Sequence, residues 1–249
     1  QRRVQSATSL PMLRRKKSKD NAMEIRSIGI IGAGQMGNGI AHVTALAGYR
    51  VVMMDISQDS LTAALSLIEK NLERQVSSAK ITAAEKATAL AQIDTTLDIS
   101  KVGQADLVIE AATEDETIKQ SIFDLLLPHL QDHTILTSNT SSISITRLAS
   151  RTDRPEKFMG FHFMNPVPVM KLVELIRGIA TDETTYAACK QVVERLGKTA
   201  ASAEDFPAFI VNRLLMPMIN EAVYTLYEGV GNVVSIDSSM RLGANHPMG

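Results

Sequence analysis

The sequence predicts an α/β fold, in which a doubly wound, mostly parallel sheet precedes an all-helical C-terminal domain. Short apolar runs alternate with longer segments of helical periodicity through roughly the first 200 residues. This alternation is typical of parallel strands covered by helices on both faces. After the stretch "TAASAED" the strand-like runs stop and a long helical pattern follows. With 249 residues, 45% of them hydrophobic and 21% charged, the chain is long enough for one large or two smaller cores.

The individual elements follow from these runs. Six short apolar runs are the expected strands, at residues 27–31, 50–55, 105–111, 133–138, 157–163 and 171–176. One helix is expected to open at the glycines after the first run, and the others are expected at about residues 58–76, 83–92, 115–127 and 183–196. Gly197 is expected to end the last of these helices.

The C-terminal part is expected to be helical. Asp205 and Pro207 resemble an N-cap followed by a proline in the first turn, and the run that follows should kink at Pro217. We therefore place a domain boundary near residue 205. The expected units are a nucleotide-binding domain at 23–204 and the start of a helical domain at 205–249.

Residues 1–22 are strongly basic. They carry seven Lys and Arg against one acid, a net charge of +6, so the rest of the chain carries −7. Such a tail fits a transit peptide, a nucleic-acid-binding arm or translated sequence upstream of a start at Met23. We favour the last reading and expect residues 1–22 to be disordered or non-native.

The remaining composition narrows the class of protein. No run approaches the roughly 18 apolar residues of a membrane span. The single cysteine, Cys189, allows no intrachain disulfide and no metal site of cysteine type, and we expect it to be a small buried hydrophobe. A reducing, cytoplasmic location, no metal and no membrane or nucleic-acid partner are the expectations.

A glycine motif marks the end of the first strand. Gly32, Gly34 and Gly37 stand in GxGxxG spacing between an apolar run and a helix, with Gln35 and Met36 in the same turn. The first glycine permits a tight turn, the second lets a pyrophosphate approach the backbone and the third permits close packing of helix on strand. This context predicts a Rossmann-type dinucleotide site.

Asp55 suggests which dinucleotide. It ends the second strand, where a carboxylate can accept hydrogen bonds from a ribose 2'-hydroxyl, and no arginine follows that could bind a 2'-phosphate. NAD is therefore favoured over NADP. The alternative is a glycine turn in an unrelated α/β protein, with Asp55 capping the next helix.

His162 and Glu174 are the candidates for acid–base chemistry. They lie twelve residues apart on neighbouring expected strands. A carboxylate bonded to one ring nitrogen fixes the tautomer and raises the basicity of the other nitrogen, and Phe161 and Phe163 are expected to exclude water from the ring. A structural ion pair between strands explains the spacing equally well.

Two further polar segments are expected near this pair. "TSNTSSIS" follows the fourth strand, so its side chains should emerge at the carboxyl edge of the sheet, although Ser142 or Ser144 could serve only as a helix cap. Asn212 lies among apolar residues just past the domain boundary, where a ligand could satisfy its amide.

Taken together, "IGIIGAGQMGNGIAH", "VIEAATED", "LTSNTSSISIT", "GFHFMNPVPVMKLVELI", "DFPAFIVNRLLMPMINEA" and "GANHPMG" resemble the L-3-hydroxyacyl-CoA dehydrogenase family, with bacterial 3-hydroxybutyryl-CoA dehydrogenases nearest in texture. The resemblance runs from about Ser27 to Gly249. It implies NAD-dependent oxidation of a 3-hydroxyacyl-CoA to a 3-oxoacyl-CoA, or the reverse, by a homodimer.

The resemblance also implies roles for individual residues. His162 would be the catalytic base and Glu174 the carboxylate that orients it, while Ser141 and Asn212 would bind the substrate oxygens. Four residues would line the nicotinamide side of the cleft, namely Glu114, Lys119, Asn139 and Asn165.

The binding site for CoA is less clearly marked. Lys70 and Arg74 share a helical face and, with Lys80, could meet the phosphates of CoA, but a solvated helix face explains them equally well.

The family pattern usually continues for some tens of residues beyond "GANHPMG". We therefore expect a helical domain with uncovered apolar faces, and a chain that aggregates or is weakly active.

Three alternatives remain open, the first of them also an enzyme. One is a related sugar-acid (gulonate-type) dehydrogenase, which activity with acetoacetyl-CoA and NADH would distinguish from a 3-hydroxyacyl-CoA dehydrogenase. Another is a non-catalytic dinucleotide-binding protein, which would not need the four catalytic candidates together. The third, a nucleic-acid binder, would rest on the basic tail alone.

Overall fold

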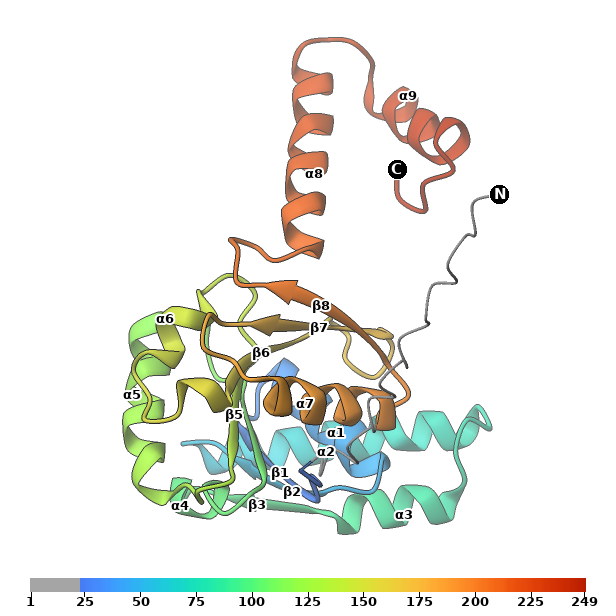
Figure 1. The fold of residues 1–249 in the computed structure, drawn as a ribbon. Coiled ribbons are helices and arrows are strands. Elements are labelled where there is room, and N and C mark those ends of the chain that lie inside the picture. Colours follow the sequence, from blue (N-terminus) through green and yellow to red (C-terminus); the bar gives the residue numbers. More distant parts are fainter. Residues whose placement is uncertain (1–22) are drawn as a thin grey trace, which may run out of the picture.

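The structure is a computed structural model that describes residues 23–249, so the basic tail lies outside the described residues. Its centre is one eight-stranded sheet of order β3-β2-β1-β4-β5-β6-β7-β8 (Figure 1). The strands are β1 Ser27–Ile31, β2 Arg50–Met54, β3 Ile93–Thr96, β4 Leu107–Glu110, β5 Ile135–Ser138, β6 Phe158–Phe163, β7 Leu172–Arg177 and β8 Thr199–Glu204. The predicted α/β class is confirmed, and β3 and β8 are strands that the sequence did not predict.

The sheet changes direction once. Strands β1 to β6 pair in parallel, β7 pairs antiparallel with β6, and β8 runs parallel to β7. The reversal follows from the short connection between β6 and β7, because parallel neighbours need a crossover of a dozen or more residues. It places two adjacent strands so that their facing residues pair directly.

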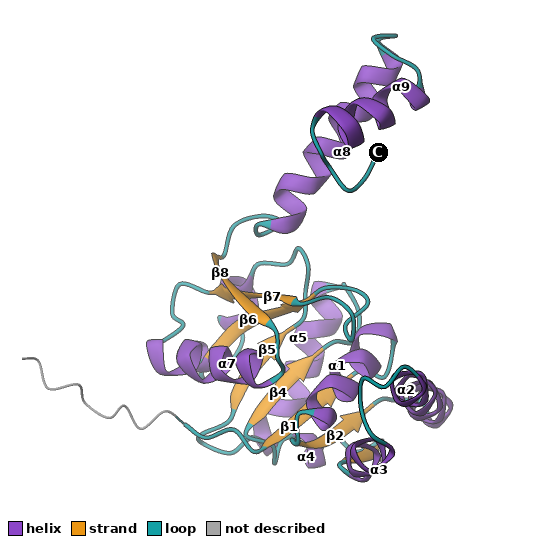
Figure 2. Cartoon of the chain, turned by 90° about the vertical axis from the view of Figure 1, so that its right-hand side faces the viewer, coloured by secondary structure: helices purple, strands orange, loops and turns teal. Residues whose placement is uncertain are grey.

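Helices cover both faces of the sheet (Figure 2). The longer ones are α1 Gln35–Leu46, α2 Gln58–Ser77, α3 Ala83–Ala91, α5 Glu116–Leu126 and α7 Glu183–Arg195, close to the predicted bounds. The short helix α4 Ile99–Val102 was not predicted, and α6 Ile145–Ala149 is the short helix that the alternative reading of Ser142 or Ser144 as a cap expected. Side-chain caps define several starts: Ser57, Thr82, Asp115 and Asp182 each accept a backbone N–H of the first turn that follows.

Two apolar clusters, one on each face, hold these layers together. One contains Ile40 of α1, Leu61 of α2 and Val192 of α7, and the other contains Phe123 of α5 and Leu148 of α6. Burying each such side chain contributes about 1.5–3 kcal/mol relative to exposure. Cys189 on α7 is fully buried in the first cluster, as predicted, and burial raises the pKa of its thiol.

Asp205 does not cap the helix that follows it, so that prediction is wrong. Helix α8, Val211–Tyr227, has Ile210 as its N-cap residue and no side-chain cap. The carboxylate of Asp205 instead accepts hydrogen bonds from Ser144 Oγ at 2.7 Å, Ile145 N at 2.9 Å and Thr146 N at 2.8 Å, at the start of α6. A carboxylate binds whichever helix start the fold brings to it, and local sequence cannot show that a distant helix competes.

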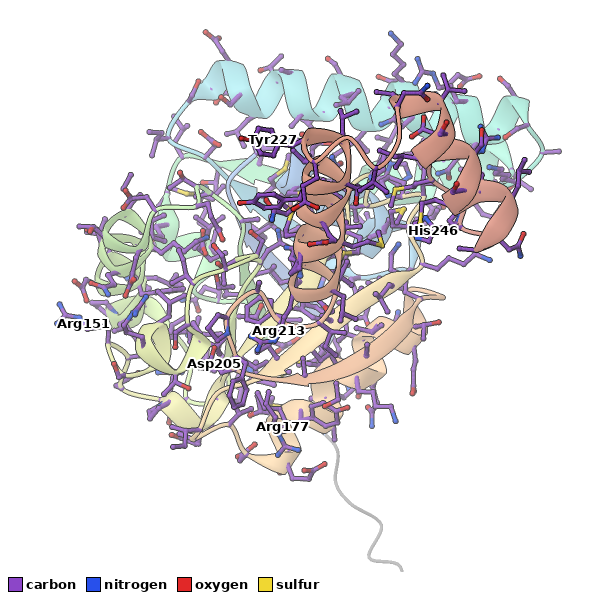
Figure 3. All side chains as sticks on the ribbon, turned by 90° about the horizontal axis from the view of Figure 1, so that it is seen from above. Arg151, Arg177, Asp205, Arg213, Tyr227 and His246 are labelled. Carbon is purple, nitrogen blue, oxygen red and sulfur yellow. The ribbon has the colours of Figure 1, made fainter. Side chains whose placement is uncertain are left out.

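The C-terminal helices project from the sheet. Helix α8 runs through Pro217 as one helix, and α9 Val233–Ser238 and a π-helical turn at Ser239–Gly243 follow it (Figure 1). Seen from above, Asp205 and Arg213 lie near the base of α8 and Tyr227 near its far end (Figure 3). No residue of α8 is buried, and Leu214 and Tyr227 are 69% and 85% exposed. Among the described helices, none has the length and hydrophobicity to cross a membrane.

Candidate active site

The glycine turn between β1 and α1 is built as the motif predicts. Gly32 has φ +102°, a conformation that favours glycine, and a Cβ on Gly37 would lie 1.7 Å from the carbonyl oxygen of Gly32. A Cβ on Gly34 would meet nothing within 4 Å, so the backbone there faces open space. Together with the free N–H groups of the first turn of α1, this surface fits a pyrophosphate.

Asp55 stabilises this turn. Its Oδ2 accepts the N–H of Ala33 at 2.8 Å and its Oδ1 accepts the N–H of Ser57 at 3.0 Å. The N-cap of α2 is Ser57, so Asp55 is not the helix cap of the alternative reading. A half-buried carboxylate at the carboxyl end of β2, beside the glycine turn, retains lone pairs for a ribose hydroxyl.

His162 and Glu174 face one another in the β6–β7 register. Their Nδ1 and Oε2 atoms are 2.7 Å apart, and His162 is 7% and Glu174 0% exposed. Burial acts to raise the pKa of Glu174, but hydrogen bonds from His162 and from the N–H of Val211 outweigh it, so this pKa lies below its usual value. Glu174 is therefore ionised at neutral pH and holds Nδ1 as the protonated nitrogen, which leaves Nε2 for chemistry.

Glu174 also reaches the helical domain. Its second oxygen, Oε1, accepts the N–H groups of Ile210 at 3.1 Å and Val211 at 2.9 Å, at the start of α8. These are orphan donors of a helix N-terminus, which favours a negative charge. One carboxylate thus links the imidazole to the helix that carries Asn212.

Phe161 and Phe163 do not flank the imidazole, so that prediction is wrong. Side chains alternate along a strand, and both phenylalanines point into the apolar cluster, with ring centroids 5.0 Å apart. The aromatic ring near His162 is that of Phe209, at 5.8 Å between centroids. Phe209 precedes α8 and is 97% buried, so the domain junction rather than the strand shields the base.

The Ser141 loop is held by one carboxylate. Glu114 Oε1 accepts Thr140 Oγ1 at 2.6 Å, the N–H groups of Ser141 and Ser142 at 2.8 and 3.0 Å, and both serine hydroxyls. Burial acts to raise the pKa of Glu114, but these hydrogen bonds outweigh it and the pKa lies below its usual value. Ser144 caps α6 as its alternative reading expected, whereas Ser141 lines a cavity at the carboxyl edge of the sheet.

Half of the predicted site residues line one cavity of about 350 Å³ at the carboxyl edge of the sheet. Its lining includes Met36, Glu114, Lys119, Asn139, Ser141, His162, Asn165 and Asn212. Larger hollows lie on α2, between α8 and α9, and beside His42 of α1, but none of the three contains these residues. The cavity therefore joins acid–base, hydroxyl and amide groups next to the glycine turn.

The two asparagines tie the cavity to its surroundings. Asn139 Oδ1 accepts the N–H of Phe163 at 2.9 Å, and Asn165 Oδ1 accepts Gln35 Nε2 at 3.2 Å. Gln35 thus connects the glycine turn to the β6–β7 loop.

One residue beside the cavity was missed by sequence reasoning: Glu110, which is fully buried and bonded to Lys119. A charged residue at the end of an otherwise apolar strand was the available signal.

Lys70 and Arg74 are not part of this cavity. They line an open hollow of about 670 Å³ on α2, which they share with Glu69, Glu73 and Lys86. Lys86 is paired with Glu73 at 2.7 Å. The hollow therefore contains both signs of charge.

Comparison with known proteins shows the family of the chain. Residues 27–206 match the family model described as 3-hydroxyacyl-CoA dehydrogenase, NAD binding domain, and residues 209–249 match the corresponding C-terminal domain. A 3-hydroxybutyryl-CoA dehydrogenase of Bradyrhizobium diazoefficiens is 59% identical over 228 residues, which cover 92% of this chain and 78% of the relative. A probable 3-hydroxybutyryl-CoA dehydrogenase of Bacillus subtilis is 47% identical, covering 91% and 79%.

A solved structure is similar along most of the chain. The (S)-3-hydroxybutyryl-CoA dehydrogenase of Ralstonia eutropha superposes with a TM-score of 0.89 at 46% identity, covering 91% of this chain and 80% of that one.

Proposed function

The chain belongs to the 3-hydroxyacyl-CoA dehydrogenase family and is an NAD-dependent oxidoreductase, and from this premise we propose that it interconverts (3S)-3-hydroxybutyryl-CoA and acetoacetyl-CoA with His162 and Glu174 as the acid–base pair. The observation that carries the proposal is the buried 2.7 Å contact between His162 and Glu174 in a cavity that also contains Ser141 and Asn212. The 3-hydroxybutyryl-CoA relatives support the short acyl chain.

The residues present fit NAD. The open backbone at Gly34, the turn at Gly32 and the carboxylate of Asp55 would hold the pyrophosphate and a ribose, with Met36, Gln35 and Gly37 completing the turn. Glu114, Lys119, Asn139 and Asn165 would line the nicotinamide side. Bound NAD would supply the acceptor for the hydride that leaves the 3-carbon.

The protein's own groups would move the proton. In the oxidative direction His162 Nε2 takes the proton of the 3-hydroxyl, and Glu174 stabilises the imidazolium through Nδ1. Ser141 Oγ would bond the reacting hydroxyl, and the Asn212 amide would bond a substrate oxygen. Each contact contributes about 1–3 kcal/mol where its loss leaves a buried partner unpaired.

A direct spectrophotometric assay tests this proposal. With acetoacetyl-CoA as substrate, the absorbance of NADH should fall as the reaction turns over, and the rate should decrease as the acyl chain is lengthened. Turnover with a sugar acid and none with acetoacetyl-CoA would favour the gulonate-type alternative. NADH binding without turnover of either would favour a non-catalytic dinucleotide-binding protein.

Lys70 and Arg74 remain our proposed contacts for the CoA phosphates. The proposal is supported by the face of α2 that Lys70 and Arg74 share and by the third basic side chain, Lys86, in the hollow of about 670 Å³ on that helix. The acidic neighbours Glu69 and Glu73 weaken the local positive charge, so the expected contribution is small.

We also propose a homodimer in the cytoplasm. The exposed apolar side chains of α8, among them Leu214, Met216, Val223 and Tyr227, support an association surface there. Light scattering on purified protein should give twice the chain mass or larger aggregates. A monodisperse monomer with full activity would contradict the dimer, and cell fractionation tests the location.

A further inference from the structure

A second buried ion pair lies beside the cavity, and its cation, Lys119, is one of the residues that line it. Glu110, the last residue of β4, is 0% exposed, and Lys119 of α5 is 2% exposed. Lys119 Nζ donates to both carboxylate oxygens of Glu110, at 2.8 and 2.6 Å. The same carboxylate accepts Ser138 Oγ at 2.7 Å and the N–H of Ala112 at 2.8 Å. Glu110 therefore joins the ends of β4 and β5 to α5.

Stability alone does not account for such a pair. Replacing a buried ion pair by apolar residues is often neutral or stabilising, so a fully buried pair is weak support for a purely structural role. This pair lies where its cation lines the cavity. Its position points to a task at the site.

The ammonium of Lys119 has a second carboxylate close by. Glu114 Oε2 is 3.9 Å from Nζ, and the other oxygen of Glu114 holds the loop at Thr140, Ser141 and Ser142. Two carboxylates thus flank one cation. The nearer one, Glu110, satisfies it and leaves Glu114 to the serine loop.

We propose that Glu110 is a positioning residue for the dehydrogenase reaction: it fixes Lys119 on the cofactor side of the cavity and keeps that ammonium from drawing Glu114 away from the Ser141 loop. The inference rests on the proposed function, which assigns Lys119 to the cofactor side and Ser141 to the substrate.

Loss of the Glu110 charge would rearrange this network. With glutamine at position 110, the buried ammonium of Lys119 would have Glu114 as its nearest carboxylate. A buried charge must be paired, and the attraction steepens as the distance shortens in a medium of low dielectric constant. Glu114 would then turn toward Lys119 and release donors of the serine loop. Cofactor binding and substrate binding would both weaken.

Removing the cation as well separates the two effects. In the double variant Glu110→Gln with Lys119→Met no ammonium competes for Glu114, so the serine loop keeps its anchor. The KM for acetoacetyl-CoA should return to about wild type while NADH binding stays weak. A merely structural role predicts no such division, because the double variant changes the packing at least as much as the single one.

The test measures the Kd of NADH by fluorescence titration and the KM of acetoacetyl-CoA at saturating NADH. Glu110→Gln should raise both by about tenfold, the equivalent of about 1.4 kcal/mol each. The double variant should keep the raised Kd and bring KM back to within about twofold of wild type. Glu116→Gln is the matched control, because Glu116 lies on α5, the helix of Lys119, in a more exposed pair with Arg147 and should change neither constant.

Two results would overturn the proposal. One is a Glu110→Gln protein with both constants within about twofold of wild type, and the other is a double variant whose KM stays as high as in the single variant. If Glu110→Gln yields no folded protein, Glu110→Asp, with its carboxylate one methylene further back, is measured instead and should raise both constants. The NADH titration needs no turnover, so it still tests Glu110 if the wild type proves inactive and the proposed function fails.

Discussion

Two buried carboxylates serve the same cavity with different partners. Glu174 accepts hydrogen bonds from the imidazole of His162 and from two backbone N–H groups at the start of α8. Glu110 accepts hydrogen bonds from the ammonium of Lys119, from one hydroxyl and from one backbone N–H group. Both are fully buried. Histidine can change its charge near neutral pH, while the lysine ammonium acts as a fixed point charge with three donors. Under our proposals, a buried carboxylate therefore supports proton transfer on one side of the cavity and positioning on the other.

The two pairs also differ in what they connect. Glu110 stays within the sheet domain, where it joins β4, β5 and α5. Glu174 joins the sheet to the start of α8, one residue before Asn212. Substitutions at Glu174 should therefore change kcat, the contact between the sheet and α8, and the stability of the fold together. Substitutions at Glu110 should change the Kd of NADH and the KM of the substrate.

The largest expected effect comes from the imidazole itself. His162→Ala should lower kcat by about 10²- to 10⁴-fold, the usual contribution of a general acid–base group, and leave the Kd of NADH nearly unchanged. Steady-state rates and NADH titration measure both quantities. His129→Ala, which changes an exposed histidine outside the cavity, is the control. A His162→Ala rate within about tenfold of wild type would end the assignment of the base.

The next effect concerns the carboxylate that orients the ring. Glu174→Gln should lower kcat by about 10- to 100-fold, since hydrogen bonds to charged groups are worth about 1.5–3 kcal/mol. Glu110→Gln should lower kcat by less, because its carboxylate binds Lys119 and Ser138 rather than the imidazole. Equal losses of kcat in Glu174→Gln and Glu110→Gln would remove the contrast between the two pairs.

Cofactor choice should change by a smaller amount. Asp55→Ala removes the carboxylate beside the glycine turn and should raise the KM of NADH by about tenfold, while the KM of NADPH changes less. Rates with both cofactors measure the ratio. Part of the loss would come from the N–H of Ala33, which the same carboxylate accepts. A variant that discriminates between the cofactors as well as wild type would show that Asp55 only supports the turn.

Sequence reasoning succeeded where a local pattern reflects local structure. The glycine turn, the main helices and the His162–Glu174 pair follow from spacing and periodicity, because neighbouring strands bring residues at both ends of a short connection together. Strand β8 was missed because its residues, "TAASAE", are mostly small, all but one are exposed or half-exposed, and they show no apolar alternation. Its pairing with β7 decides its conformation, and pairing is not a local property.

The missed features of the site have the same origin. Glu110 meets Lys119 through the packing of α5 on the sheet, and Asp205 meets the start of α6 some 60 positions earlier in the chain. Phe161 and Phe163 were assigned to the imidazole by adjacency in sequence, although adjacent strand residues face opposite sides. Contacts across the domain junction, such as Phe209 on His162, leave no local pattern.

Acid should reduce the stability difference between wild type and Glu174→Gln. The pKa of Glu174 is lower in the folded protein than its ordinary value of 4.5. This carboxylate therefore contributes stability above about pH 4.5, and the contribution is lost as the pH falls through the lowered folded pKa. In urea unfolding, the free energy of unfolding should be clearly higher for wild type than for Glu174→Gln at neutral pH, and this difference should become smaller in acid. A difference that widens in acid would contradict the sign of the shift.

The smallest expected effect tests the CoA contacts on α2. Lys70→Ala combined with Arg74→Ala should raise the KM of acetoacetyl-CoA by about threefold at low salt, because exposed ion pairs contribute about 0.2–1 kcal/mol. The difference should vanish at high salt, where exposed charges are screened within a few ångströms. Lys101→Ala, on an exposed lysine of α4, controls for the loss of one positive charge. An unchanged KM at low salt would assign both side chains to a solvated helix face and leave substrate binding to the cavity that the two buried carboxylates organise.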